Sequence, residues 1–396
     1  MPARRVAGLT KYLSRLGYDV TILTSSISGD GLIQGAVEVV RTADLMASPL
    51  NWRRRHFAAL TGRESHDYSG PSRVQAAIVP DLALITWVPI ATARALRLAR
   101  SHDYDVVITT SPPPSAHLVG LALRGRGIPC IAELRDGWTF EPPHAPWPWA
   151  LQRRADRALE AWLLKRADAV IAVTKPIVED LSRRLGVDAR LITNGFDPDE
   201  LQAGEGSDSL LDPERHSIVH TGRIALARSS PRPLLDGLRI LERTDPAAAA
   251  RIELVFAGPL SQEERDLMTS PDVAPFVRVA GPLERERTLR LQREADTLLV
   301  VTEGSSRRSV ATGKLFEYLA AGRPVLVLGE ETEAARIVTE TGSGFATSAE
   351  DPKAIADALR RVAAGDVDIA GRNGVEAYSY ERLAEEYARV IDSICR

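Results

Sequence analysis

The most constraining feature of this chain is a repeated alternation of helix patterns with short apolar strand patterns. In the first half, strands are expected at 18–24, 106–109, 130–133 and 169–173, each preceded by an amphipathic segment. After residue 212 the pattern restarts, and strands are expected at 218–221, 251–257, 277–280, 297–301 and 324–328. Such alternation predicts parallel sheets with helices on both faces. The expected fold class is therefore α/β, with two Rossmann-like doubly wound domains and a ligand cleft between them.

Chain length and one polar stretch predict the domain boundaries. A chain of 396 residues is too long for one ordinary core. Gly, Asp, Asn and Ser gather over 192–212, and we interpret 196–212 as a linker between a domain over 1–195 and a domain over 213–375. The last segment, 376–396, is expected to hold a helix that crosses back to the first domain. Because a helix pattern opens the chain with no strand before it, we expect that the first strand is missing and that the true start lies upstream.

Composition and charge exclude several classes of protein. The 50 basic and 53 acidic residues leave a net charge of −3, too balanced for a dedicated nucleic-acid binder. Cys130 and Cys395 are the only cysteines, and no His or Cys cluster has metal-ligand spacing, so no metal is expected. Asp197–Asp199 and Asp366–Asp368 spell DxD but stand in expected turns. No signal peptide or membrane span is predicted, which favours the cytoplasm.

Two arginines follow the first strand of the second domain. Gly222 and Arg223 stand at the carboxyl end of the strand expected at 218–221, where open parallel sheets bind ligands, and Arg228 comes five residues later. Guanidinium groups suit phosphate oxygens because they make bidentate contacts and are always charged. The alternative is that both arginines are solvated surface side chains of an arginine-rich chain.

A second candidate is the helix start near residue 313. Gly313 lets a ligand approach the backbone, and the free N–H groups of a helix start attract anions. Lys314, beside Leu315, adds a positive charge for a diphosphate. Glu317 is expected in the first turn, where its carboxylate can hold a ribose diol. The alternative is that Glu317 is only a favourable charge at a helix N-terminus.

With these residues in place, the chain resembles the GT-B glycosyltransferases. It is most similar to the retaining enzymes of family 4 that assemble bacterial exopolysaccharide, lipopolysaccharide and capsule. The motifs that carry the resemblance run through nearly the whole chain, and their order and spacing are specific: ARRVAGLTKYLSRLGYDVTILT, VVITTSPPPSAHLVG, GIPCIAELRDGW, HTGR, VFAGPL and GKLFEYLAAGRPVLVLG. The resemblance implies metal-independent sugar transfer from a nucleotide-diphosphate sugar, with a UDP-sugar as the expected donor and no cofactor. The implied acceptor is a glycan or a lipid-linked sugar.

The resemblance also implies roles for single residues. Arg223 and Arg228 would bind the donor diphosphate and stabilise the departing nucleotide. Glu317 would hold the ribose. The remaining donor-site residues implied are Gly222, Gly313, Lys314 and Leu315. One departure concerns the family's E-x7-E signature, whose first Glu is Ser309 here, so the loop must shift to use Glu303 or the sugar contact must be made differently.

In the first domain, the resemblance implies that Arg135 and Asp136 serve the acceptor. Asp136 would accept a hydrogen bond from an acceptor hydroxyl or orient a positive group near the reaction centre. The alternative is that the two form a local ion pair that caps a loop. His117 either faces the cleft or packs in the core, and His144 is interpreted as structural or acceptor-side.

Aromatic and basic residues gather in the first domain. Residues 51–57 read NWRRRHF, the first hundred residues hold 13 basic against 7 acidic side chains, and every Trp lies in this domain. This composition suits peripheral contact with the inner face of an anionic membrane; the alternative, which stays open, is a solvated charge run with core tryptophans. Two other functions stay open: a sugar-nucleotide 2-epimerase of the same fold, and a catalytically weak scaffolding relative.

Overall fold

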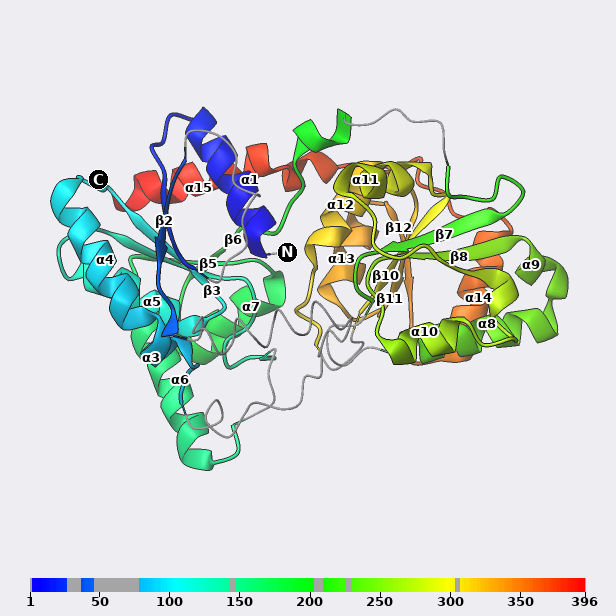
Figure 1. Cartoon of the computed structure of the whole chain (residues 1–396), viewed down its shortest axis with the longest axis horizontal. Helices are drawn as coiled ribbons and strands as arrows, with labels where there is room; N and C mark the ends of the chain where they lie inside the picture. Colours follow the sequence, from blue (N-terminus) through cyan, green and yellow to red (C-terminus); the bar gives the residue numbers. More distant parts are fainter. Residues whose placement is uncertain are drawn as a thin grey trace. The chain divides into compact units, whose positions relative to one another are not determined.

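The computed structural model describes residues 2–26, 37–45, 78–142, 147–202, 209–224, 230–302 and 307–395. It forms two compact units, of which unit 1 is Met1–Thr193 with Glu381–Arg396 and unit 2 is Asn194–Tyr380 (Figure 1). Four features singled out in the sequence lie outside the described residues: the 51–57 segment, His144, Arg228 and Glu303.

The described residues of unit 1 form two parallel sheets. One pairs β1 (Thr21–Ser25) with β2 (Glu38–Thr42), and Thr21 lies opposite Glu38. The other has four strands in sequence order: β3 (Val107–Ser111), β4 (Cys130–Leu134), β5 (Ala169–Ala172) and β6 (Ala189–Leu191). The α/β class with parallel sheets is thereby confirmed. The predicted strand at 18–24 begins later than expected, at Thr21, and is half-buried, and among the described residues β2 is the one strand that pairs with it.

The helices of unit 1 cover these sheets. They are α1 (Pro2–Arg15), α3 (Ala83–Thr86), α4 (Val88–Ser101), α5 (His117–Arg124), α6 (Ala150–Leu164), α7 (Lys175–Asp180) and most of α15 (Tyr380–Ile394). All five residues of β4 are buried, as expected for a central parallel strand with helices on both faces. One core cluster joins β4 and β5 to α6 and α7, and another joins α4 to α5.

A buried ion pair ties both ends of the chain to β4. Arg5 of α1 and Glu133 of β4 are only 2% and 3% exposed, and Arg5 Nε and Nη2 donate to Glu133 Oε1 at 2.9 and 2.8 Å. The Tyr387 hydroxyl of α15 donates to the same oxygen, and Arg5 also donates to the Ile192 carbonyl at 2.9 Å. Burial by itself raises the pKa of Glu133, but Arg5 and these hydrogen bonds together hold it below its ordinary value.

Unit 2 is built on one six-stranded parallel sheet in the order β12-β11-β10-β7-β8-β9. Its strands are β7 (His216–Thr221), β8 (Ile252–Ala257), β9 (Val277–Val279), β10 (Thr297–Val301), β11 (Val325–Leu328) and β12 (Gly344–Thr347). Its helices are α8 (Arg232–Thr244), α9 (Pro246–Ala250), α10 (Gln262–Met268), α11 (Arg285–Glu294), α12 (Gly313–Ala321), α13 (Glu333–Glu340) and α14 (Pro352–Ala363).

Successive residues of the central strands point into two different cores. Ile218 and Leu254 pack with α8, α9 and α14, whereas Val219 and Val255 pack with α11, α12 and α13 (Figure 1). The strand order reverses between β7 and β10, whose following helices lie on opposite faces of the sheet. In open parallel sheets, the crevice at the carboxyl ends of two such strands is where ligands bind.

The stretch predicted as a linker, 196–212, begins with residues that pack on unit 2. The division between the units falls after Thr193, and Phe196 is buried in the core of unit 2. Its N–H donates to the Tyr378 carbonyl at 3.1 Å, and the Tyr380 N–H donates back to the Phe196 carbonyl at 2.8 Å. The described start of the stretch is therefore ordered by two kinds of contact: the Phe196 ring packs in the core of unit 2, and its backbone makes hydrogen bonds with Tyr378 and Tyr380.

Candidate functional site

Two glycine turns touch at the carboxyl ends of β7 and β8, next to the switch point of unit 2. Gly222 follows β7 with a φ of +81°, and its N–H donates to the Ala257 carbonyl at 2.7 Å. A Cβ placed on Gly258, which follows β8, would lie 2.3 Å from the Gly222 carbonyl oxygen. Both positions therefore require glycine, one for its backbone angle and the other for close approach. The turn presents Arg223 as an exposed residue at the carboxyl edge of the sheet.

Lys314 of α12 lies directly under this turn. The side chain is buried, and its ammonium donates to the Arg223 carbonyl at 2.6 Å and lies 3.1 Å from His220 Nε2. Burial, and then the charge of Lys314, lower the pKa of His220 to about 3, so the ring is neutral. Because His220 Nδ1 lies 2.9 Å from the Leu299 carbonyl, we assign the ring proton to Nδ1 and an accepting lone pair to Nε2. The lysine thus joins α12 to the Arg223 turn.

Glu317 lies one turn further along α12. No acidic residue stands in the first turn of this helix, so the expected first-turn position of Glu317 is wrong. Its Oε2 lies 3.0 Å from Arg285 Nη1 and accepts a 3.4 Å hydrogen bond from Gln292 Nε2. Both partners belong to α11 and were not predicted. They hold the carboxylate in place between α12 and α11.

The other residues expected near the donor differ in what they do. Gly313 begins α12 as predicted from the glycine signal. Leu315 is fully buried in the core, and its N–H donates to the Thr312 carbonyl at 3.0 Å, so its side chain serves packing. Tyr318 connects the helix to β7, because its hydroxyl accepts the Thr221 N–H at 2.7 Å. Ser309 is buried.

In unit 1, Arg135 and Asp136 follow β4 at the carboxyl edge of the four-stranded sheet. The Arg135 Nε donates to the Ser111 carbonyl at 3.1 Å and its Nη2 donates to the Pro112 carbonyl at 3.0 Å. Burial lowers the pKa of Arg135, although nearby carboxylates, Asp136 among them, oppose this shift. The guanidinium therefore anchors the loop after β3, while Asp136 stays half-buried beside it. His117 is fully buried, which agrees with its interpretation as a packing residue.

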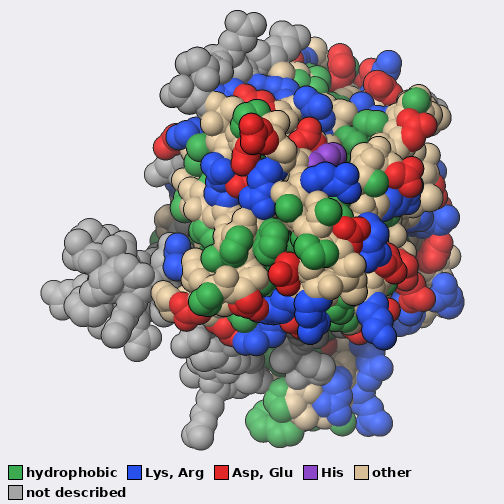
Figure 2. All heavy atoms as spheres, turned by 90° about the vertical axis from the view of Figure 1, so that its right-hand side faces the viewer, with side chains coloured by type: hydrophobic (Ala, Val, Ile, Leu, Met, Phe, Trp, Pro, Cys, Tyr) green, Lys and Arg blue, Asp and Glu red, His purple; other side chains and the backbone are tan. Residues whose placement is uncertain are grey.

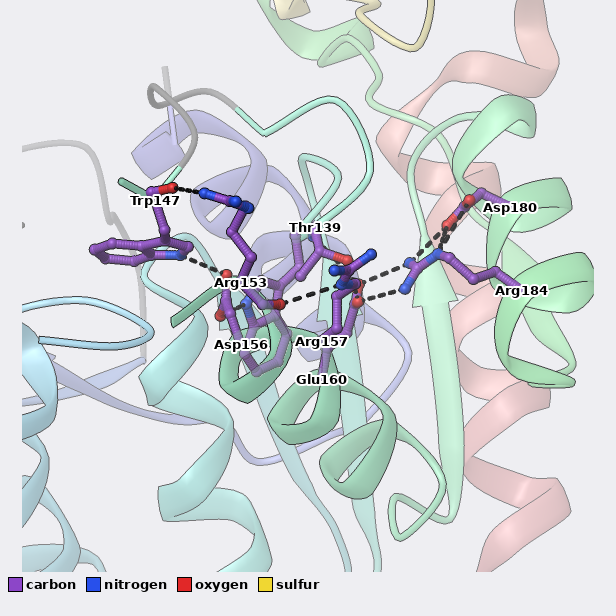
Figure 3. Close-up of polar contacts among 9 residues, drawn as sticks. Thr139, Trp147, Arg153, Asp156, Arg157, Glu160, Asp180 and Arg184 are labelled. Carbon is purple, nitrogen blue, oxygen red and sulfur yellow. Dashed lines mark hydrogen bonds and ion pairs between the residues drawn. The ribbon is translucent and has the colours of Figure 1, made fainter. Parts of the chain in front are cut away.

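The loop that begins at Asp136 is fastened to α6 by two buried carboxylates (Figure 3). Asp156 accepts the indole N–H groups of Trp138 and Trp147 at 2.8 and 2.7 Å. Glu160 accepts the Thr139 hydroxyl at 2.5 Å and an Arg184 guanidinium at 2.7 Å. Nothing in the local pattern predicts this arrangement, because the carboxylates and their donors stand up to 24 residues apart.

The DxD motifs are turn residues in the structure. Asp197 Oδ1 accepts the Asp199 N–H at 3.0 Å, and Asp368 Oδ1 accepts the Ala370 N–H at 2.7 Å. Over the described part of the chain, no three His, Cys, Asp or Glu side chains gather as a metal site. Within the same residues, every helix is too short or too polar to cross a membrane.

The chain has two α/β units, each built on parallel strands, and this is the architecture of the GT-B glycosyltransferases. Unit 2 also carries glycine turns, an arginine, a lysine and a carboxylate near the carboxyl ends of its strands. Family models agree with this assignment. Residues 2–200 match the model described as Glycosyltransferase Family 4, and residues 215–364 match glycosyl transferases group 1. The chain belongs to glycosyltransferase family 4 and is a glycosyltransferase.

Solved structures with the same fold are distant in sequence. Sucrose-phosphate synthase from Thermosynechococcus elongatus is 18% identical with a TM-score of 0.65, over 98% of this chain and 92% of that one. A trehalose-6-phosphate synthase studied for glycosyl transfer with retention is 14% identical with a TM-score of 0.61, over 98% and 96%. The S. aureus MnaA–UDP complex is 13% identical with a TM-score of 0.54, over 99% and 93%. No curated protein sequence matches the chain.

Proposed function

We propose that this enzyme moves a sugar from a UDP-sugar to a glycan or lipid-linked acceptor, with retention of configuration, in cell-surface polysaccharide synthesis. The observation that carries the proposal is the contact of α12 with the end of β7, where Lys314 donates to the Arg223 carbonyl and Gln292 donates to both Glu317 and the Thr221 hydroxyl. The motif pattern, the trehalose-6-phosphate synthase described with retention and the MnaA complex with UDP add support. A lipid-linked acceptor would bring the enzyme to the inner face of the membrane as a peripheral protein.

In this proposal, unit 2 binds the donor. The diphosphate lies against the Arg223 side chain and the α12 start at Gly313, and Arg228 adds a second guanidinium. Arg223 stabilises the negative charge that develops on the departing nucleotide, which is the interaction that accelerates the reaction. Glu317, held by Arg285, accepts the ribose hydroxyls. The positive side chains neutralise the diphosphate, so the proposed chemistry needs neither a metal nor a cofactor.

Unit 1 would then bind the acceptor. Asp136 stands at the carboxyl end of β4 and accepts an acceptor hydroxyl in the proposed complex. Arg135 serves as a positioning residue, because its guanidinium already holds the Ser111 and Pro112 carbonyls. Asp156 of α6 supports the same loop by accepting the Trp138 indole N–H.

Lys314 makes donor binding depend on pH. Burial lowers the pKa of Lys314 to about 8, and a bound diphosphate would raise it again by stabilising the charged form. The affinity for UDP is therefore expected to fall by up to about tenfold per pH unit above about pH 8. Calorimetric titration from pH 7 to 9 measures this slope. Titration of the uracil ring contributes equally to the wild type and to Lys314→Met. The variant has no lysine to titrate at this position, so its affinity should depend less steeply on pH. Parallel pH profiles of the two proteins would place the lysine away from the diphosphate.

The assignment of the ribose to Glu317 is tested by Glu317→Gln. Losing a charged acceptor of two hydroxyl hydrogen bonds is expected to weaken UDP binding about tenfold or more. Glu263→Gln, an exposed carboxylate of the same unit, is the control. Equal affinity of Glu317→Gln and the wild type would contradict the ribose assignment.

The reaction itself is tested with purified enzyme, a set of UDP-sugars and a polysaccharide-repeat acceptor. Proton NMR of the product's anomeric signal should show the donor's configuration retained. Epimerised nucleotide sugar without transfer would instead identify a 2-epimerase. A folded protein that binds nucleotide but neither transfers nor hydrolyses the sugar would be a scaffolding relative.

A further inference from the structure

Helix α6 has an unusual division of side chains between its inner and outer faces. Its carboxylates point inward, where Asp156 and Glu160 are buried and accept hydrogen bonds from Trp138, Trp147, Thr139 and Arg184 (Figure 3). An ordinary surface helix places its charged groups outward and its apolar groups inward. Here the inner face is occupied in part by two acids, so the outer face has none of its own.

The outer face of α6 is apolar along one stripe. Leu151, Ala155, Ala158 and Trp162 follow the spacing i, i+4, i+7 and i+11, which puts them on the same side of the helix, and all four are exposed. Leu151 is 76% exposed and Trp162 45%. Trp149, at the N-terminal end of the helix, extends the stripe and is 65% exposed. The stripe runs over roughly 20 Å of helix.

Basic side chains border this stripe. The exposed residues Arg154, Arg157, Lys165 and Arg166 lie along the same helix and its end, and no Asp or Glu from 148 to 166 is exposed. The Arg166 guanidinium lies over the Trp162 ring, 4.7 Å from its centroid. By contrast, basic and acidic side chains are interspersed on the face of the molecule in Figure 2. We call the stripe and its basic border the outer face of α6.

We propose that the outer face of α6 docks on an anionic lipid bilayer. Tryptophan and leucine side chains enter the headgroup–acyl boundary of a membrane, and arginine and lysine are attracted to its anionic headgroups. A second copy of this chain would oppose like charges, and a nucleic acid would leave the apolar stripe without a partner. The inference deepens the proposed function and rests on its membrane-linked acceptor, because it names the surface that meets the membrane.

The test is sedimentation of the full chain with vesicles. We expect binding to vesicles of phosphatidylglycerol and phosphatidylcholine and much weaker binding to phosphatidylcholine alone. Arg154→Glu with Lys165→Glu and Arg166→Glu should lower the partition coefficient by roughly a hundredfold or more, at about 1 kcal/mol for each basic residue near an anionic surface. Trp149→Ser with Leu151→Ser and Trp162→Ser should also reduce binding. The charge-matched control, in unit 2, is Arg243→Glu with Arg265→Glu and Arg287→Glu.

Vesicle binding and donor binding are scored separately, by sedimentation and by thermal stabilisation with UDP. Variants that bind vesicles as the wild type does, or a wild type that ignores anionic vesicles, would overturn the docking surface even where UDP binding is normal. Binding of single-stranded RNA is measured as well. If RNA displaces the protein from the vesicles, and if the apolar and the basic variants lose RNA affinity to the same extent, the outer face of α6 binds nucleic acid instead. Vesicle binding without any UDP response would leave the docking surface standing and contradict the proposed function.

Discussion

Replacing Arg223 with alanine is expected to lower the turnover of nucleotide sugar by about a hundred- to a thousandfold. Removing one preorganised donor that stabilises charge in a transition state has this effect, about 3–4 kcal/mol. The side chain is exposed at the carboxyl edge of β7. Its backbone is held independently, because Lys314 and the Gly222 turn bind main-chain atoms. The substitution should therefore remove the guanidinium without disturbing the turn.

Turnover measured under saturating donor separates this effect from weaker binding. Arg232→Ala is the matched control, because Arg232 is an exposed arginine of the same unit, paired with Glu263. Arg223→Ala should unfold at the same temperature as the wild type. Turnover within a few-fold of the wild type would show that the diphosphate is bound elsewhere.

Replacing Arg5 with methionine is expected to destabilise unit 1 by about 3–5 kcal/mol. Breaking a buried ion pair from one side leaves the other charge without a partner in a poorly solvating interior. Glu133 would be left with the Tyr387 hydroxyl, and the Ile192 carbonyl would lose its donor. Because every tryptophan lies in unit 1, urea titration followed by tryptophan fluorescence reports the unfolding of this unit alone.

The matched variant is Arg5→Met combined with Glu133→Leu. Removing both charges is expected to restore most of the lost stability, because no buried charge is then left unpaired.

The stabilisation by the Arg5–Glu133 pair also depends on pH. Since the pKa of Glu133 in the folded state is below its ordinary value of 4.5, the pair stabilises the fold above that pH and loses its effect as the pH falls through the folded-state pKa. A single variant as stable as the wild type at pH 7 would contradict this account.

The strands of unit 2 could be predicted because buried parallel strands are continuous apolar runs. The run at 252–257 reads IELVFA and became β8, buried at every position. Three described strands, two of them in unit 1, had no such signal. β12 reads GFAT and begins with a glycine at a φ of +153°, β2 reads EVVRT and carries polar ends, and β6 is only three residues long and reads ARL. Short or polar strands are recognised only from their neighbours in the sheet.

Site residues next to strand and helix ends could be predicted from their positions, and their partners could not. Gly222, Arg223 and Lys314 follow the rule that ligands bind at the carboxyl ends of strands. Arg285 gives no local signal, because it meets Glu317 from another helix. Arg5 looks like a polar residue on an amphipathic helix, yet it is buried against a carboxylate 128 positions away.

In helix α6, the sequence likewise fails to show which face of the helix is buried. The periodic pattern of apolar residues indicates a helix, but it does not say which side is covered. In the structure, buried acids form part of the inner side and Leu151 and Trp162 are left outside. Their orientation depends on tryptophan N–H groups from the preceding loop, which periodicity does not describe.

The most direct test of the central claim is thermal stabilisation of the purified chain by UDP, GDP, dTDP, ADP and CMP, repeated with Arg223→Ala. A ligand at a hundred times its Kd adds about 2.7 kcal/mol to the free energy of unfolding, which shifts the melting temperature measurably. The account predicts a shift with a nucleoside diphosphate, UDP above the others, that disappears in the variant. A folded protein whose melting temperature responds to none of the five nucleotides would contradict it.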